Sequence, residues 1–190
     1  EVFSAWMRIL RKAPDSILWL IDFQGPGNEA LKREASARGV DPSRIIFADK
    51  YPNDVHLARL ALADLALDTY HHAGGVTTTD ALWAGLPVLT IMHEGMVDRL
   101  GGSVLTAAGL PELIASSLDD YMRKALAYFE DPDSLQRLKV KLKDNQATEP
   151  LFDTPRLTRD LEAIFTEMWR RYEEGAEPGT IELAPVPADG

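Results

Sequence analysis

The first two thirds of the chain alternate between amphipathic stretches and strongly apolar ones. The amphipathic stretches predict helices over residues 4–12, 29–38 and 53–63. The short apolar runs that predict buried strands occupy residues 16–23, 44–48, 65–68 and 87–91. Alternation of strands and helices is typical of a parallel sheet, so the pattern predicts an α/β fold with one Rossmann-like layer.

Residues that start or stop helices lie at the ends of these segments. Asn28 can cap the helix 29–38, and Gly39 can end it. Asn53 or Asp54 is the predicted start of the helix that follows the second strand. These boundary residues support the same division of the chain as the hydrophobic pattern.

From about residue 97 the pattern changes to consecutive helices. The predicted helices cover 97–107, 111–115, 118–130, 132–145 and 155–173. Ser116 or Ser117 can cap the third of them, and Pro132 opens the fourth. We expect residues 1–175 to form one domain and the acidic, Pro-, Gly- and Ala-rich segment 176–190 to be a flexible tail.

Composition limits the classes of function. The formal net charge of −10 argues against a broad nucleic-acid surface or an anionic membrane surface, because both would repel the chain. There is no apolar run long enough for a membrane span and no secretory signal. The absence of cysteine excludes disulfides and thiolate chemistry and is typical of a cytoplasmic protein. Because the chain begins with Glu1, we expect it to be a piece of a longer protein.

The segment HHAGGVTTTDALWAG, residues 71–85, combines a strand end, a glycine turn and a predicted helix start near Val76. Gly74 and Gly75 let the backbone approach an anion closely, and the first N–H groups of the helix supply positive potential. The hydroxyl groups of Thr77, Thr78 and Thr79 can cap the helix or donate to phosphate oxygens. The segment therefore predicts a phosphate site.

Asp80 lies one turn into that helix, where its carboxylate can accept hydrogen bonds from ribose hydroxyls, as acidic residues do in dinucleotide sites. This combination indicates a nucleotide diphosphate. A second interpretation stays open on the pattern alone, a capping box with Thr77 as N-cap and Asp80 as its acidic partner. The segment matches neither the dinucleotide fingerprint nor a Walker motif.

Histidines supply the other candidates. His56 can stack on a nucleotide base or hydrogen-bond to it, and the alternative is an exposed helical histidine without a ligand. Arg59 is three residues further on and shares the helix face of His56, which favours the base contact. His71 and His72 are adjacent on an extended segment and point to opposite sides, and no ligand cluster follows them. We therefore expect no metal site. The tryptophans 6, 19, 83 and 169 stand in apolar patterns and are predicted to be core residues.

With TTTDALWAGLPVLT, residues 77–90, the sequence resembles the C-terminal catalytic half of the protein O-linked N-acetylglucosamine transferase family, which includes SPINDLY-type proteins. Further blocks that resemble the family are RIIFADKYPNDVHLARLALADLALDT, GLPELIA, EPLFDT and EMWRRYEEG. The blocks occur in the same order as in the family and span about Trp6 to Gly175.

The resemblance implies the second Rossmann-like half of a GT-B glycosyltransferase, followed by several C-terminal helices. It implies that this half binds a UDP-sugar donor, with His56 on the uracil or pyrophosphate side and Arg59 at the uracil edge. The implied diphosphate site comprises Gly74, Gly75, Val76, Thr77 and Thr78, and Asp80 would hold the ribose. Gly75 and Val76 replace a family histidine and threonine, and Asn53 replaces a lysine.

The resemblance also implies partners that this chain lacks. The catalytic base, the acceptor side and the tetratricopeptide repeats belong to segments before the region that matches Glu1, and helix 155–173 would pack on the missing half. The implied reaction uses no cofactor and no metal, takes a UDP-sugar as substrate and modifies a protein acceptor. The alternatives are fucose from a GDP donor, glucose transfer to Asn, and a non-catalytic nucleotide-binding or scaffold module.

Overall fold

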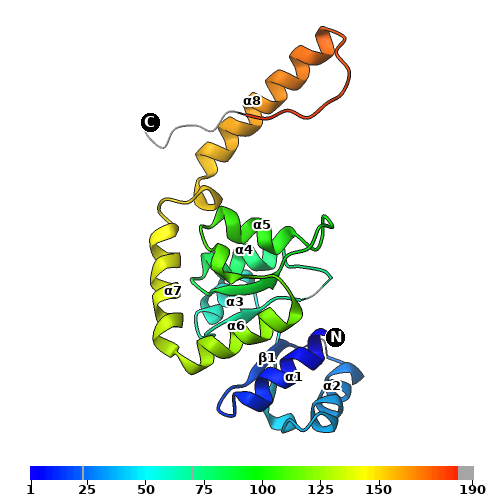
Figure 1. Ribbon diagram of the computed structural model, residues 1–190, viewed down its shortest axis with the longest axis vertical. Helices are drawn as coiled ribbons and strands as arrows, with labels where there is room; N and C mark the ends of the chain where they lie inside the picture. The colour runs from blue at the N-terminus through cyan, green and yellow to red at the C-terminus, as the bar shows by residue number, and fades with distance from the viewer. Residues whose placement is uncertain (23, 70, 184–190) are drawn as a thin grey trace.

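The computed structural model describes residues 1–22, 24–69 and 71–183. Short strands alternate with helices through the first part of the chain, and helices follow it (Figure 1). The strands are β1 (Leu18–Ile21), β2 (Ile45–Ala48), β3 (Ala66–Leu67), β4 (Val88–Ile91) and β5 (Ile114–Ala115). The helices among them are α1 (Val2–Lys12), α2 (Pro26–Ala37), α3 (Asn53–Leu60), α4 (Val76–Trp83) and α5 (Leu100–Ala107). The later helices are α6 (Leu118–Glu130), α7 (Pro132–Asn145) and α8 (Thr154–Glu173).

Every strand pair in the described chain is parallel, which confirms the predicted α/β class. The strands form two hydrogen-bonded sheets, β1 with β2 and β3 with β4 and β5. Leu18 lies opposite Ile45 in the first sheet, and Ala66 lies opposite Val88 in the second. One buried apolar cluster contains residues of both sheets, so the two share a core.

The prediction of a helix over residues 111–115 is wrong. Residues Pro111–Leu113 form a single 3₁₀ turn, and Ile114–Ala115 form a fifth strand beside β4. Thr90 lies opposite Ile114 in that pairing. A strand of this length leaves no periodic pattern, and the ladder contact that defines it comes from residues distant in sequence. We predicted a single layer of four strands, but the described residues form two sheets with five strands in all.

Helix boundaries agree closely in places and differ in others. Helices α6 and α7 have the predicted bounds, and the Ser117 hydroxyl accepts a hydrogen bond from the backbone N–H of Asp120. Gly39 ends α2 with a φ of 75°, as predicted. The Asn28 cap is wrong, because α2 starts at Pro26, and the Asn28 amide donates to Asp22 Oδ1 at 2.6 Å. Helix α5 starts at Leu100 and α3 ends at Leu60, three residues inside their predicted ends.

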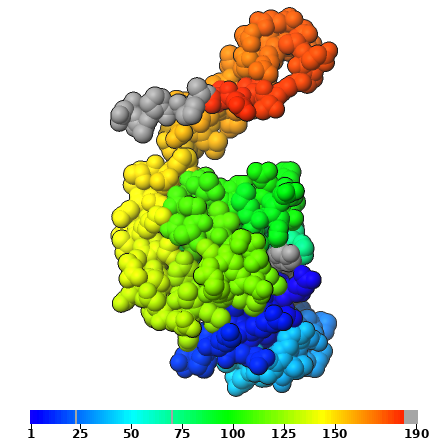
Figure 2. All heavy atoms as spheres, viewed as in Figure 1, coloured from blue at the N-terminus to red at the C-terminus, as the bar shows by residue number. Residues whose placement is uncertain are grey.

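Helix α8 extends away from the rest of the molecule (Figures 1 and 2). None of its residues is buried, although it carries an apolar stripe. The exposed members of the stripe are Leu157, Leu161, Phe165, Met168, Trp169 and Tyr172. Its packing on another half of the protein stays a prediction. No helix in the described ranges is both long enough and apolar enough to span a membrane.

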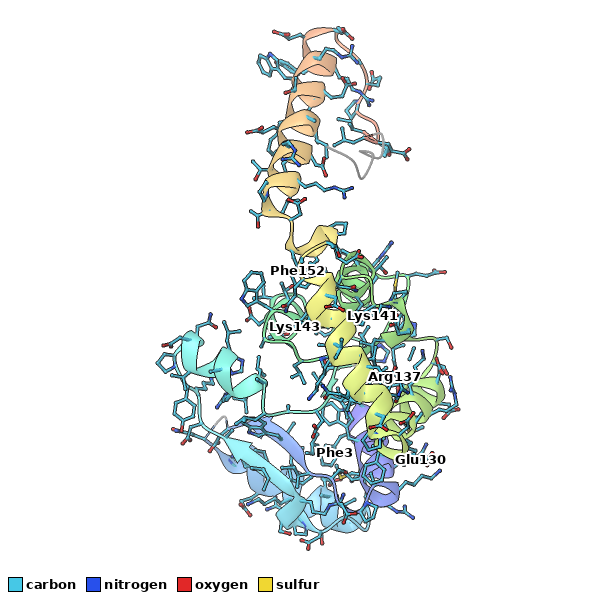
Figure 3. The ribbon with its side chains drawn as sticks, turned by 90° about the vertical axis from the view of Figure 1, so that its left-hand side faces the viewer. Phe3, Glu130, Arg137, Lys141, Lys143 and Phe152 are labelled. Atoms are coloured by element: carbon cyan, nitrogen blue, oxygen red, sulfur yellow. The ribbon has the colours of Figure 1, made fainter. Side chains whose placement is uncertain are left out.

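The prediction of a core role is correct for Trp6 but wrong for Trp83 and Trp169, which are 62% and 61% exposed. Trp83 packs on Phe152, with ring centroids 6.2 Å apart, near the junction of α7 and α8 where Figure 3 labels Phe152. Residues 176–183 have no helix or strand, and residues 184–190 of the predicted tail lie outside the described residues.

A chain of hydrogen bonds joins the covering helices to the sheet. Trp6 Nε1 in α1 donates to the Tyr121 hydroxyl in α6 at 3.1 Å. The Tyr121 hydroxyl donates to the backbone carbonyl of Asp68, directly after β3, at 2.9 Å. Burial raises the pKa of Tyr121 well above its ordinary value, so this phenol stays protonated and remains a donor. The end of β3 is thereby connected to helices α6 and α1.

Tyr121→Phe tests this connection. The substitution removes the acceptor for Trp6 and the donor for Asp68, so we expect it to lower the free energy of unfolding by about 1–3 kcal/mol. Urea denaturation monitored by circular dichroism measures the change. The control is Tyr128→Phe in the same helix, since no described residue hydrogen-bonds to the Tyr128 hydroxyl. Equal stability changes in the two variants would contradict the assignment.

Candidate functional site

The loop between β3 and α4 has the predicted geometry of strand, glycine turn and helix start. Gly75 takes the N-cap position of α4 without a side-chain cap. The backbone hydrogen bond from Thr79 N to the carbonyl of Gly75 closes the first turn at 3.0 Å. The N–H groups of Val76 and Thr77 therefore have no carbonyl of their own helix to donate to. They are placed to bind an anion, and both residues are exposed.

The threonines of this segment differ in what their hydroxyls do. Thr78 is 3% exposed, and its hydroxyl donates to the carbonyl of Gly74 at 2.9 Å. The Thr79 hydroxyl donates to the carbonyl of Gly75 at 3.2 Å. Thr77 alone among the three is exposed. Thr77 is thus the member whose hydroxyl can reach a bound phosphate, while Thr78 and Thr79 hold the loop.

The capping-box interpretation is wrong. Gly75 rather than Thr77 is the N-cap, and glycine has no side chain with which to cap the helix start. Thr77 lies inside the first turn, which moves Asp80 beyond the position where an acidic partner would reach back. Asp80 is half-buried in α4, and its proposed contact with a ribose stays a prediction.

Gly74 is required by close packing. A Cβ atom at this position would lie 2.5 Å from Thr78 Oγ1 and 2.7 Å from Thr77 Oγ1. At Gly75 the nearest atom would be Leu100 Cδ1 at 3.9 Å, which is an ordinary contact. The absence of a side chain at Gly74 therefore leaves room for the hydroxyl groups of Thr77 and Thr78, whereas Gly75 has space around it.

Asp68 is one of the site residues that the sequence interpretation missed. Its Oδ1 accepts hydrogen bonds from the backbone N–H groups of Thr69 at 2.8 Å and Gly74 at 2.9 Å. Its Oδ2 accepts from the Thr90 hydroxyl at 2.6 Å. The available signal was a carboxylate at a strand end just before a glycine loop, but its partners cannot be inferred from spacing.

His56 and Arg59 lie together on α3, which packs against α4. Arg59 Nε donates to His56 Nδ1 at 3.1 Å, so the predicted shared face is confirmed. Arg59 Nη1 also donates to the carbonyl of Asp49 at 2.6 Å. In a neutral His56 this leaves the ring proton on Nε2. Contact of either side chain with a base stays a prediction.

Two aromatic rings hold the Arg59 guanidinium. Its Cζ atom lies 5.1 Å from the centre of the Tyr51 ring and 5.6 Å from that of Trp19. Tyr51 is half exposed, at 52%. Neither aromatic was assigned to the site from the sequence, because their contact with Arg59 depends on the fold of β1 and the loop after β2.

Two surface hollows lie at the carboxyl ends of the strands, where ligands of open α/β sheets bind. One of about 850 Å³ follows β4 and β5 and is lined by His71, Met92, Glu94 and Asp98 among others. A smaller one of about 480 Å³ follows β1 and β2 and includes Tyr51. None of the predicted site residues is among the residues that line these two hollows.

In the described residues, the two histidines of the loop do not belong to a cluster of three potential metal ligands. His71 adopts a φ of 68°, and its Nε2 lies 3.9 Å from Glu1 Oε2. Thr69 donates to the carbonyl of His72 at 2.6 Å. Among residues 1–22, 24–69 and 71–183, no three His, Asp or Glu side chains gather as metal ligands would. The expectation of a metal-free site stays a prediction.

Parallel strands, a glycine loop and an uncapped helix start at the carboxyl edge of a sheet are the construction of a nucleotide-binding α/β domain. The family model for glycosyl transferase family 41 matches residues 1–161. This chain belongs to glycosyl transferase family 41.

Similar proteins have consistent names. The chain is 38% identical over 179 residues to the probable UDP-N-acetylglucosamine peptide N-acetylglucosaminyltransferase SEC of Arabidopsis thaliana, covering 94% of this chain and 18% of that protein. It is 37% identical over 175 residues to the Caenorhabditis elegans UDP-N-acetylglucosamine peptide N-acetylglucosaminyltransferase, covering 92% of this chain and 15% of the relative. The chain thus spans a fifth or less of the length of these relatives.

A solved structure agrees with the fold. A mutant of the Thermobaculum terrenum O-GlcNAc transferase superimposes with a TM-score of 0.83 at 32% sequence identity. The match covers 89% of this chain and 33% of that one. The predicted fold class, a Rossmann-like domain of a GT-B glycosyltransferase followed by helices, is confirmed.

Gly74→Ala tests the packing of the glycine loop. The new methyl group would displace the threonine hydroxyls, so we expect a loss of about 1–3 kcal/mol in the free energy of unfolding. Thermal and urea denaturation measure it. Gly27→Ala in α2 is the matched control, because a Cβ there meets nothing within 4 Å. We expect that variant to be as stable as the parent or more stable. An unchanged stability in Gly74→Ala would show that the loop accommodates a side chain.

Proposed function

We propose that this chain is the donor-binding half of an inverting glycosyltransferase that transfers N-acetylglucosamine from UDP-N-acetylglucosamine to Ser or Thr of proteins. The observation that carries the proposal is the uncapped start of α4 behind the Gly74 loop, in a chain of glycosyl transferase family 41. The names of the Arabidopsis and nematode relatives support the choice of sugar and acceptor.

The start of α4 is the proposed diphosphate site. The N–H groups of Val76 and Thr77 donate to phosphate oxygens there, and the Thr77 hydroxyl adds a third donor. The helix dipole supplies positive potential without a metal ion. In the reaction, this site stabilises the negative charge that develops on the departing UDP. The site therefore assists cleavage of the bond between the sugar and UDP. The sugar passes directly to the acceptor, without a covalent enzyme intermediate.

The nucleoside lies toward α3 in this proposal. Arg59 is held by the Asp49 carbonyl and by two aromatic rings, and it orients the His56 imidazole. This arrangement presents a planar ring and a guanidinium to the uracil side of the donor. Asp80 accepts hydrogen bonds from the ribose hydroxyls. Together these contacts fix the donor for attack, and positioning is a large part of the rate enhancement.

The remaining parts of the reaction belong to the longer protein. We propose that an N-terminal half supplies the catalytic base and acceptor side, and that tetratricopeptide repeats bind the protein acceptor. The exposed stripe of α8 packs on that half, which would remove its apolar side chains from water. The proposed setting is the cytoplasm. No cofactor is needed beyond the UDP-sugar substrate.

Calorimetric titration with UDP, GDP and NAD tests the donor assignment. We expect selective binding of UDP. Preference for GDP would indicate a fucose donor, and preference for NAD would indicate a dinucleotide enzyme. Asp80→Ala should weaken UDP binding about tenfold or more, since it removes charge-assisted hydrogen bonds to the ribose. The matched control is Asp15→Ala, an exposed carboxylate outside the site.

The full natural chain is used in these titrations, so that both halves of the cleft are present. Binding of GDP in preference to UDP would replace the proposed donor with that of a fucosyltransferase. Loss of all nucleotide binding in a folded protein would favour a scaffold module. If UDP binds, transfer assays with Ser/Thr and Asn peptides then separate the two acceptor types.

A further inference from the structure

We propose that Asp68 is a positioning residue that presets the diphosphate-binding N–H groups of α4. The inference rests on the proposed function, because it concerns the same donor site. Asp68 is placed by β3 and acts on the loop through its own carboxylate. The inference assigns it no contact with the donor.

The carboxylate joins the two ends of the loop. One oxygen, Oδ1, accepts from the N–H of Thr69 at the start of the loop and from that of Gly74 at its end. A carboxylate can accept several hydrogen bonds at once, and bonds to a charged acceptor are stronger than neutral ones. The side chain therefore fixes the spacing between the strand end and the residue before the N-cap.

The other side of the loop is held by the helix that it precedes. The Thr78 hydroxyl donates to the carbonyl of Gly74, whose N–H is already bonded to Asp68. Gly74 is thus held at both its N–H and its carbonyl. The following N–H groups, at Val76 and Thr77, are left pointing out of the helix start. Their direction depends on the orientation that Asp68 imposes on Gly74.

The Asp68 carboxylate, which with its bonds to Thr69 and Gly74 forms a clamp on the loop, is itself held in place by neighbouring elements. Asp68 Oδ2 accepts from Thr90, whose side chain is fully buried in β4. Gly101 of α5 closes over this pair, since a Cβ there would lie 2.6 Å from Asp68 Oδ2 and 2.8 Å from Thr90 Oγ1. The backbone carbonyl of Asp68 also accepts from Tyr121. Contacts from β4, α5 and α6 therefore determine where the carboxylate lies.

The role is geometric rather than attractive. A carboxylate near a diphosphate repels it, so Asp68 cannot assist binding through its own charge. Its hydrogen bonds orient the donors that do assist. An asparagine has nearly the same shape and can keep Oδ1 as the acceptor for both N–H groups, with its amide donating to Thr90. The Thr90 hydroxyl then donates to the carbonyl of Ile91, 3.4 Å away.

The experiment measures the affinity of the full natural chain for UDP and for uridine, which lacks the phosphates. The ratio of the two affinities isolates the phosphate contribution. We expect Asp68→Ala to reduce this ratio about tenfold or more, with uridine affinity nearly unchanged. Asp68→Asn should keep the ratio within about threefold of the parent. Asp80→Ala provides the contrast, because loss of a ribose contact weakens both ligands and leaves the ratio intact.

A second pair of variants covers the case in which Asp68→Ala does not fold. Gly101→Ala pushes against the clamp without removing any hydrogen-bonding group, and we expect it to lower the ratio about threefold or more. Gly102→Ala is the matched control in the same helix, because its Cβ would meet Met92 instead. Circular dichroism establishes that each variant is folded.

The outcomes separate the two proposals. Failure of the parent protein to bind UDP refutes the proposed function, and the role of Asp68 with it. Binding of UDP by the parent with an unchanged ratio in folded Asp68→Ala, or in Gly101→Ala, refutes the positioning role alone. An equal loss in Asp68→Asn and Asp68→Ala, or in Gly102→Ala and Gly101→Ala, also overturns it, because charge or general packing would then be responsible.

Discussion

Asp68 connects the sheet, the covering helices and the glycine loop through its backbone and its carboxylate. The backbone N–H pairs with the carbonyl of Leu89 in β4, and the backbone carbonyl accepts from Tyr121 in α6. The carboxylate reaches the loop and the buried hydroxyl of Thr90. Each of these groups would be costly to leave without a partner in a partly buried position, so the contacts stabilise one another. The start of α4 inherits its position from this arrangement.

Strands β1 to β4 and helices α6 to α8 could be predicted because their signals are local. The apolar run at β4 and the serine cap and periodicity of α6 each lie within one segment of sequence. The strand β5 could not be predicted, since it exists only through its pairing with β4. The error at Asn28 has a local cause, because the helix already starts at Pro26, two residues before Asn28, and the Asn28 amide bonds to Asp22 instead of capping the helix.

The site likewise has features that the sequence predicts and features that it does not. The glycine turn and the pairing of His56 with Arg59 follow from spacing and are confirmed. Asp68, Tyr51 and Trp19 were missed because their roles depend on contacts between segments far apart in sequence. The exposed Trp169 shows a further limit, since an apolar stripe such as that of α8 does not tell which surface will cover it.

The central claim is that the donor diphosphate binds at the start of α4. A crystal structure of the full natural chain with UDP tests it most directly. We expect phosphate oxygens within hydrogen-bonding distance of the N–H groups of Val76 and Thr77, with Asp68 still bonded to Gly74. A diphosphate bound instead in the hollow after β4 and β5, without contact to those N–H groups, would contradict it.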